Sequence, residues 1–208
     1  MASPQLALRD RQVELTRDLI LQALADLIGE GRLAEFSIQE VADRAGVSLR
    51  TVYRHFASRE ALLDAFGPWG VERARAAGAF EFPAKADDIA PLLRQKFAAF
   101  EGLAPIVVAL AKLDAATGIG TPVAAKSLRS IRSSLADLTA DLDPKLAEAV
   151  VWTIRILWSH KTWAAFHDEG GVDGLHAGAA AAWAVEALVK ALRDGQGPTF
   201  GEGRPTVK

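Results

Sequence analysis

The stretch that decides the fold is SIQEVADRAGVSLRTVYRHF, residues 37–56. Its first half spaces apolar residues along one face of a helix, and Ser37 followed three residues later by Glu40 is a capping-box start. This pattern predicts a short helix over residues 37–44. Gly46 comes next and can adopt the positive φ angle that a tight turn between two helices needs.

A second short helix is expected over residues 49–56, with Ser48 as its N-cap. The apolar residues that should point inward are Val47, Val52 and Phe56. The other side chains would cover the outer side, and they are of the types that contact base edges and phosphates: Leu49, Arg50, Thr51, Tyr53, Arg54 and His55. Two short helices around a glycine turn indicate a helix-turn-helix whose second helix reads DNA. We predict DNA contacts from this outer face and from the two capping residues, Ser37 and Ser48.

An alternative interpretation is an ordinary pair of helices whose arginines are simply solvated. The distribution of charge favours DNA binding. The chain carries a net charge of −2, yet residues 44–59 contain four arginines and no Asp or Glu. A local positive field on an otherwise acidic body fits a protein that touches a polyanion with one face.

The apolar helix before the hairpin and the segments EVADRAGVS, TVYRHF and SREALL closely resemble the DNA-binding domain of the TetR family of bacterial transcriptional repressors. The resemblance covers about the first 66 of the 208 residues. It implies a homodimer whose second hairpin helix enters the major groove, and a larger helical C-terminal domain that binds an effector and forms the dimer. Carried over residue by residue, it places Tyr53 and His55 near phosphates. It also places Arg59 on the DNA backbone, where the family often has lysine, a change that phosphate binding tolerates.

Composition excludes several classes of protein. With 208 residues and 50% hydrophobic content the chain can bury a sizeable core. The absence of cysteine excludes a disulfide framework, a thiolate zinc site and a thiol nucleophile. The first residues lack the charged-then-apolar order of a signal peptide, and no apolar run approaches the ~20 residues of a membrane-spanning helix. We therefore expect a cytoplasmic protein with no membrane partner.

The remaining segments are also helical in pattern, which predicts an all-α fold. It would consist of an N-terminal three-helix helix-turn-helix domain, residues 1–66, and a larger helical effector and dimerisation domain, residues 67–195, followed by a flexible tail at 196–208. Outside the hairpin, helices are expected at residues 9–29, 86–100, 103–113, 123–142, 144–168 and 174–194, with a loop at 117–122.

A fourth helix should follow the cap residue Ser58 in the N-terminal part. Gly67 and Pro68 come directly after it. Because proline removes a backbone donor and clashes with the preceding turn, the helix should stop or kink there. Such a break would form a hinge between the two domains.

Alanine is concentrated near the C-terminus, with eight alanines in the sixteen residues 177–192. This density allows helices to approach closely. Burial within the monomer is the ordinary explanation. We favour a four-helix dimer interface formed by the last two helices of each chain, because recognition of two half-sites requires a two-fold dimer.

Aromatic residues crowd the expected helix 144–168, which is apolar on more than one side. One side could face the partner subunit and the other a pocket for a small apolar or aromatic effector. The residues expected to line this pocket are Phe97, Phe100, Trp152, Ile156, Trp163 and Phe166. Plain core packing is the alternative for each of them.

No metal site or cofactor is expected, since His160 and His167 lie two helical turns apart and no dinucleotide fingerprint is present. The sequence thus predicts a DNA-binding transcriptional regulator, a repressor released from a palindromic double-stranded operator by a small hydrophobic effector. One alternative is a DNA-binding regulator without a small-molecule ligand. An enzyme built on the helical domain is the least favoured, because no nucleophile, base and oxyanion stabiliser are grouped.

Overall fold

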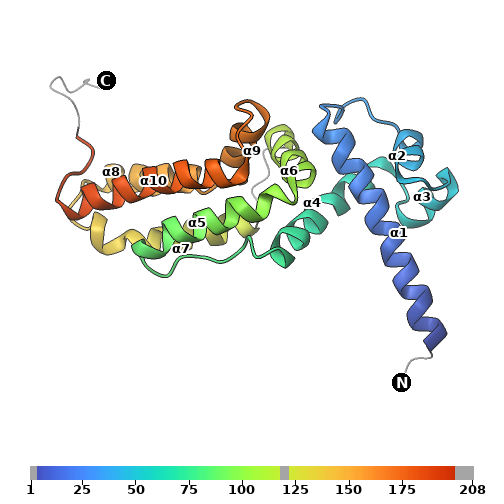
Figure 1. The fold of residues 1–208 in the computed structure, drawn as a ribbon, viewed down its shortest axis with the longest axis horizontal. Coiled ribbons are helices and arrows are strands. Elements are labelled where there is room, and N and C mark those ends of the chain that lie inside the picture. Colours follow the sequence, from blue (N-terminus) through green and yellow to red (C-terminus); the bar gives the residue numbers. More distant parts are fainter. Residues whose placement is uncertain (1–3, 118–121, 200–208) are drawn as a thin grey trace. The chain divides into compact units, whose positions relative to one another are not determined.

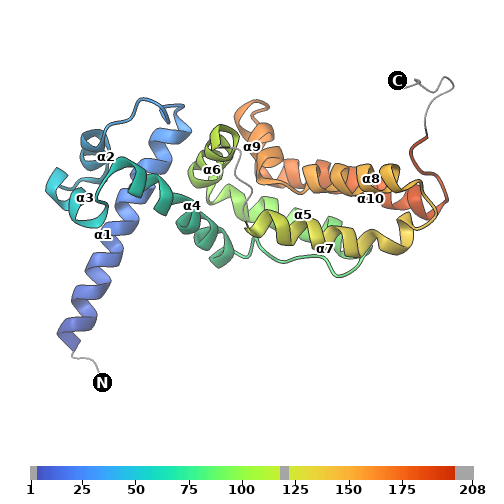
Figure 2. The same ribbon diagram turned by 180° about the vertical axis from the view of Figure 1, so that it is seen from behind.

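The computed structural model describes residues 4–117 and 122–199, which form ten helices and no strand (Figures 1 and 2). The all-α fold is confirmed. The chain divides into two compact units. Unit 1 contains α1 (Pro4–Gly29), α2 (Ile38–Ala45), α3 (Leu49–His55), α4 (Arg59–Ala76) and α6 (Ala104–Thr117). Unit 2 contains α5 (Ala86–Glu101), α7 (Pro122–Thr139), α8 (Pro144–Leu157), α9 (His160–Asp168) and α10 (Gly174–Arg193). The expected loop at 117–122 and tail at 196–208 lie largely outside the described residues.

Unit 1 is built around α1, whose apolar face supports the hairpin of α2 and α3. The fully buried side chains of this core include Ile20, Leu21, Leu24, Ile28, Val41, Ala42, Val52, Leu62 and Phe66. Helix α6 joins the same core through Ile106 and Ala109. It approaches α4 closely, because a Cβ atom added at Gly70 would lie 3.0 Å from a methyl group of Leu110. The compact unit thus includes α6 and all of α4, beyond the boundary expected at residue 66.

The sequence led us to expect that α4 stops or kinks at Pro68. The helix does not stop there but continues for eight residues to Ala76. Proline leaves the carbonyl of Asp64 without its usual helical donor. Contacts with α1 hold the second half of the helix in place, since the indole N–H of Trp69 donates to Asp18 over 2.7 Å and Arg73 forms an ion pair with the same carboxylate. Tertiary packing therefore outweighs the local cost of the proline.

In unit 2 the closest helix pair is α5 and α10, which run side by side (Figure 1). The α10 face toward α5 is made of small and branched residues: Gly174, Ala177, Gly178, Ala181, Ala182, Val185 and Val189. A Cβ atom at Gly174 would lie 2.4 Å from the carbonyl oxygen of Phe97. The buried part of the alanine-rich segment thus packs inside the monomer, against α5. A dimer interface on the rest of this helix stays a prediction.

The sequence predicts one long helix at residues 144–168. This prediction is wrong, because the chain turns between α8 and α9. Ser159 has the extended backbone of an N-cap (φ −80°, ψ 151°), and its hydroxyl accepts the N–H of Thr162 over 3.0 Å. The carbonyl of Trp158, at the end of α8, accepts a hydrogen bond of 3.0 Å from the ammonium of Lys96 on α5. A side-chain cap and a lysine from another helix together stabilise this break.

Of the described helices, α10 alone is long and apolar enough to cross a membrane by length and composition. The helices at the centre of globular proteins often meet the same criterion. Its buried face packs on α5, and its exposed face includes Glu186 and Lys190. Its packing on α5 therefore accounts for the apolar residues of its buried face.

Candidate nucleic-acid interface

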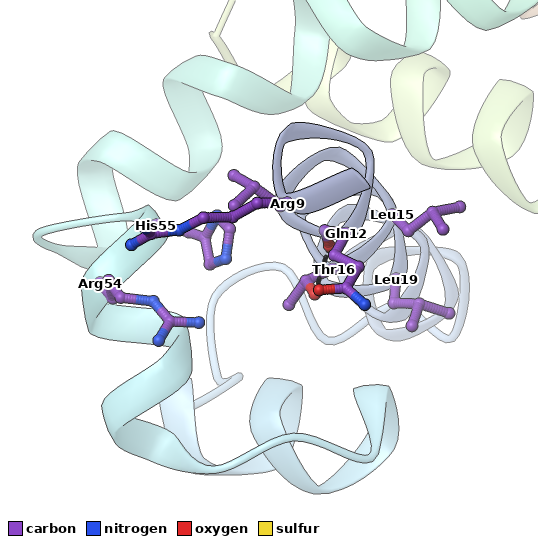
Figure 3. A pocket seen from close by; sticks show the side chains of 8 residues that line it. Arg9, Gln12, Leu15, Thr16, Leu19, Arg54 and His55 are labelled. Atoms are coloured by element: carbon purple, nitrogen blue, oxygen red, sulfur yellow. Dashed lines mark hydrogen bonds between the residues drawn. The ribbon is translucent and has the colours of Figure 1, made fainter. Parts of the chain in front are cut away.

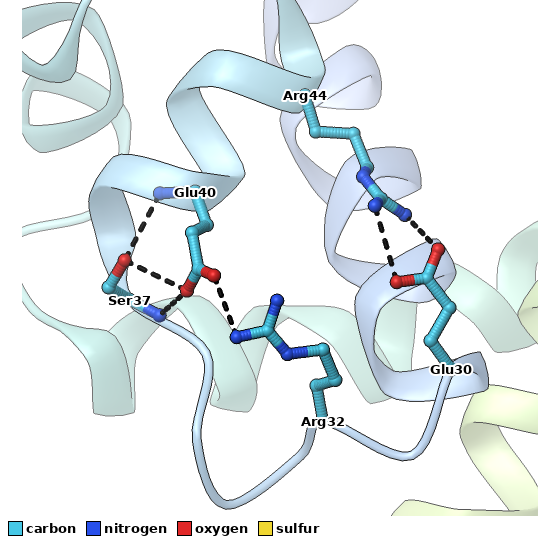
Figure 4. Close-up of polar contacts among 5 residues, drawn as sticks. All are labelled: Glu30, Arg32, Ser37, Glu40 and Arg44. Atoms are coloured by element: carbon cyan, nitrogen blue, oxygen red, sulfur yellow. Dashed lines mark hydrogen bonds and ion pairs between the residues drawn. The ribbon is translucent and has the colours of Figure 1, made fainter.

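Helix α2 begins with the capping box predicted from the sequence (Figure 4). The Ser37 hydroxyl accepts the N–H of Glu40 over 3.2 Å, and the Glu40 carboxylate accepts the N–H of Ser37 over 2.8 Å. The same carboxylate forms an ion pair of 2.7 Å with Arg32. Three donors lower the pKa of Glu40. The Ser37 backbone N–H has the largest effect, followed by the Ser37 hydroxyl and then by Arg32. The start of α2 is therefore fixed by hydrogen bonds that join the backbone N–H and side chain of Ser37 to those of Glu40.

The turn between α2 and α3 depends on Gly46, which adopts the left-handed conformation (φ 68°, ψ 29°). Its N–H reaches the carbonyls of Ala42 and Asp43, which closes the end of α2. Ser48 then caps α3 by accepting the N–H of Thr51 over 3.1 Å. The turn and its two caps set the direction of α3 relative to α2.

Helix α3 buries one side and exposes the other, as predicted. Val52 and Phe56 are buried in the core of unit 1. On the outer side Arg50, Tyr53 and Arg54 are exposed, while Leu49, Thr51 and His55 are partly buried. The hydroxyls of Ser37 and Ser48 lie at the surface but are engaged in capping. Their role in DNA binding stays a prediction.

The four arginines of residues 44–59 have different surroundings. Arg44 forms a two-pronged ion pair with Glu30 (Figure 4), which cancels its charge locally. Arg59 donates to the carbonyl of Leu33 over 2.5 Å, and its guanidinium lies 4.2 Å from the centre of the Phe36 ring. Arg50 and Arg54 make no ion pair with any described residue. They are therefore the cations of this segment best placed to meet an anion.

A groove of about 640 Å³ lies beside α3, between it and the N-terminal half of α1 (Figure 3). Arg54 and His55 line it from α3, and Arg9, Gln12 and Thr16 line it from α1, together with Val13, Leu15 and Leu19. The contribution of α1 was not predicted from the sequence. The signal that could have found it is the cluster of polar and basic residues before the apolar periodicity of that helix begins.

His55 is the one imidazole of this groove. Its Nε2 atom is buried and has no hydrogen-bond partner among the described residues. Burial lowers the pKa of His55, and the nearby charges of Arg54 and Arg17 lower it further. A neutral imidazole at neutral pH can still donate one hydrogen bond to a phosphate.

Residues 20–66, from the middle of α1 to the first half of α4, match the family of bacterial regulatory proteins, tetR family. This segment contains the capped α2, the glycine turn and the exposed face of α3. The resemblance to the TetR family of transcriptional regulators, expected from the sequence, is thus confirmed over residues 20–66. DNA binding through a helix-turn-helix, predicted from residues 37–56, is thereby confirmed.

Solved structures of TetR-family regulators share the fold. One from Rhodococcus sp. aligns with 84% of this chain and 98% of its own length, with a TM-score of 0.61 and 20% identity. A second, from Streptomyces coelicolor, aligns over 88% and 85%, with a TM-score of 0.52 and 20% identity. A gamma-butyrolactone receptor, described as ArpA-like, aligns over 85% and 98%, with a TM-score of 0.50 and 20% identity. No curated protein matches the sequence.

The six residues predicted to line an effector pocket do not all lie together in the structure. Phe97, Phe100 and Trp163 are buried together, with ring centres 6.3 Å apart for the two phenylalanines and 5.8 Å for Phe100 and Trp163. Phe166 is partly buried. Trp152 and Ile156 are 48% and 59% exposed. Because the helix breaks at Ser159, Trp152 and Ile156 lie on α8 and Trp163 lies on α9, and the role of the six residues as a pocket lining stays a prediction.

Proposed function

We propose that this TetR-family regulator is a cytoplasmic repressor that binds a near-palindromic operator as a homodimer and is released by a small apolar effector. The observation that carries the DNA-binding part is the exposed side of α3, where Arg50, Tyr53 and Arg54 are available for contact. Arg50 would read base edges in the major groove. Tyr53, Arg54 and His55 would hold phosphates, and Arg9 of α1 would extend the contact beyond α3.

The exposed apolar residues of unit 2 support dimerisation through α8 and α10. Trp183 is 71% exposed and Leu175 70% exposed on α10, on the side away from the packed small residues. Trp152 and Ile156 are exposed on α8. Large aromatic side chains in contact with water are typical of protein interfaces. Dimers of this kind place two reading helices at successive turns of the major groove, ~34 Å apart.

The effector would occupy the aromatic interior of unit 2, around Phe97, Phe100 and Trp163. Relatives with this fold include a gamma-butyrolactone receptor, which supports a small molecule as ligand. A regulator without any small-molecule ligand is the alternative, in which these aromatics are plain core.

Selection of bound fragments from the source genome tests the main proposal. Bound fragments should share a near-palindrome, and its two halves should each be required for affinity. Trp183→Glu should dissociate the dimer and weaken operator binding at least tenfold, because a carboxylate would be buried in an apolar interface. Ala115→Glu, which adds the same charge at an exposed position of α6, is the matched control. A monomer that binds the operator with unchanged affinity would contradict the proposal.

A further inference from the structure

Lys96 is a basic side chain that is buried inside unit 2, where the described residues supply no counter-ion. It is 7% exposed, and no acidic group among the described residues forms an ion pair with it. The ammonium nitrogen lies 4.9 Å from the ring centre of Trp158, 5.6 Å from that of Phe100 and 5.9 Å from that of Phe80. Cation–π attraction to these rings offsets part of the cost of burying the ammonium.

The structural role of Lys96 accounts for only part of its hydrogen-bonding capacity. One N–H donates to the carbonyl of Trp158 at the end of α8. The other two have no acceptor among the described residues, although an ammonium has three donors. Burial lowers the pKa of Lys96 to about 7, with a smaller contribution from the charge of Arg155. A helix end needs no such costly donor, since lysines can cap helices from the surface.

Trp158, whose ring faces the ammonium, carries a second unused donor. Its indole Nε1 is buried and has no hydrogen-bond partner among the described residues. An indole N–H can only donate, as can an ammonium. The Lys96 ammonium and the Trp158 indole are therefore two buried groups that have unused N–H donors, and aromatic rings surround the ammonium. The complement of such a pair is an oxygen anion attached to an apolar body, because a carboxylate accepts from several donors and supplies the missing negative charge.

We propose that Lys96 and the indole N–H of Trp158 bind the carboxylate of an apolar acid, and that this acid is the effector. The proposal rests on the repressor function proposed above and specifies the chemistry of its ligand. A neutral alcohol of the same skeleton offers no charge to the ammonium and should bind less well. A ligand at this site would also contact the end of α8, because Trp158 ends that helix. Helix α8 carries Trp152 and Ile156, the exposed residues of the proposed dimer interface.

The test compares acids with alcohols of the same carbon skeleton on the full-length chain. The pairs are 4-phenylbutyrate with 4-phenylbutanol, and decanoate with decanol, each titrated by calorimetry near pH 7. At least one acid should bind tenfold or more tightly than its alcohol, as expected for a charge-assisted hydrogen bond. Equal binding of acid and alcohol, or no acid binding below millimolar concentration, would overturn the proposal.

Variants assign the preference to the two donors. Lys96→Met keeps the length of the side chain and should abolish the preference for acids. Trp158→Phe keeps an aromatic ring and should weaken acid binding severalfold. Lys112→Met is the matched control, because the Lys112 ammonium also donates to a helix-end carbonyl, that of Gly29, but in unit 1. A preference for acids that survives in Lys96→Met would refute the assignment.

The effector role is separated from the DNA-binding role by titrating operator DNA in the presence of the acid. The acid should weaken operator binding in the concentration range in which it binds the protein. Acid binding that leaves operator affinity unchanged would refute the effector role. A chain that binds no operator at all, yet prefers acids through Lys96, would refute the repressor function while leaving the acid site in place.

Discussion

Replacing Lys96 by methionine should increase the free energy of unfolding of unit 2, and the increase should shrink as the pH rises. In the folded chain the pKa of Lys96 is lowered from 10.5 to about 7. Below pH 7 both folded and unfolded states hold the proton, so the folded state bears the full cost of a buried ammonium. Between these two pKa values only the unfolded state stays protonated, and the cost falls with pH. Methionine does not titrate, so the gain in free energy of unfolding on Lys96→Met should vary with pH in the same way as the cost of the buried ammonium.

The size of the effect follows from the lowering of the pKa. At about 1.4 kcal/mol for each unit of pKa, the cost reaches about 5 kcal/mol at low pH and declines by roughly 2–3 kcal/mol between pH 6 and pH 9. Methionine also leaves the Trp158 carbonyl without its donor, which costs about 1–2 kcal/mol at every pH. The net gain should therefore be about 3 kcal/mol near pH 6 and close to zero near pH 9.

Urea denaturation followed by tryptophan fluorescence measures this gain. Four of the five tryptophans belong to unit 2 and one, Trp69, to unit 1, so the signal reports mainly on unit 2. The parent and Lys96→Met would be compared at several pH values, with Lys112→Met as the control for losing a lysine cap. A difference between parent and Lys96→Met that is constant across pH would show that Lys96 is not buried as an ammonium, and the reasoning would fail.

Two further predictions concern unit 1. Arg50→Ala should relax the sequence preference at one or two base pairs by about 1–3 kcal/mol, whereas Arg54→Ala should lower the affinity for all sequences alike. Footprinting on variant operators measures both effects. Identical losses of affinity on every sequence for both variants would argue against base reading by Arg50. Arg59→Ala should lower the free energy of unfolding by about 1–2 kcal/mol, since it removes the hydrogen bond to Leu33 and the stacking on Phe36, and thermal unfolding that matches the parent would contradict this. Gly46→Ala should cost about 1 kcal/mol, because a Cβ atom strains the left-handed turn although nothing crowds it, and an unchanged melting temperature would speak against that strain.

The hairpin could be predicted almost residue by residue because its signals are local. Ser37, Glu40, Gly46 and Ser48 each act on a backbone group within four residues, so the sequence contains both partners of every contact. The outer face of α3 follows from helical periodicity alone.

The errors arose where a distant contact decided the structure. The end of α8 at Trp158 is held by Lys96, sixty-two residues away, and the second half of α4, past Pro68, is held by Asp18. Both partners are invisible to local periodicity. Trp152 and Trp163 share a face only in an unbroken helix, so the break at Ser159 also divides two residues of the predicted pocket between α8 and α9. The contribution of Arg9 beside α3 was likewise a matter of tertiary packing.

The pairing of Arg44 with Glu30 bears on how strongly DNA binding should depend on salt. Each phosphate neutralised by a protein cation releases about 0.9 condensed counterion from the duplex, and this release sets the slope of binding affinity against salt concentration. An arginine that already shares its charge with a carboxylate adds little to that release. The regulator should thus respond to ionic strength as if the segment held fewer cations than the sequence contains, with Arg50 and Arg54 dominant. Its discrimination between operator and bulk DNA would then rest more on the contacts of α3 with base edges than on general attraction to the polyanion.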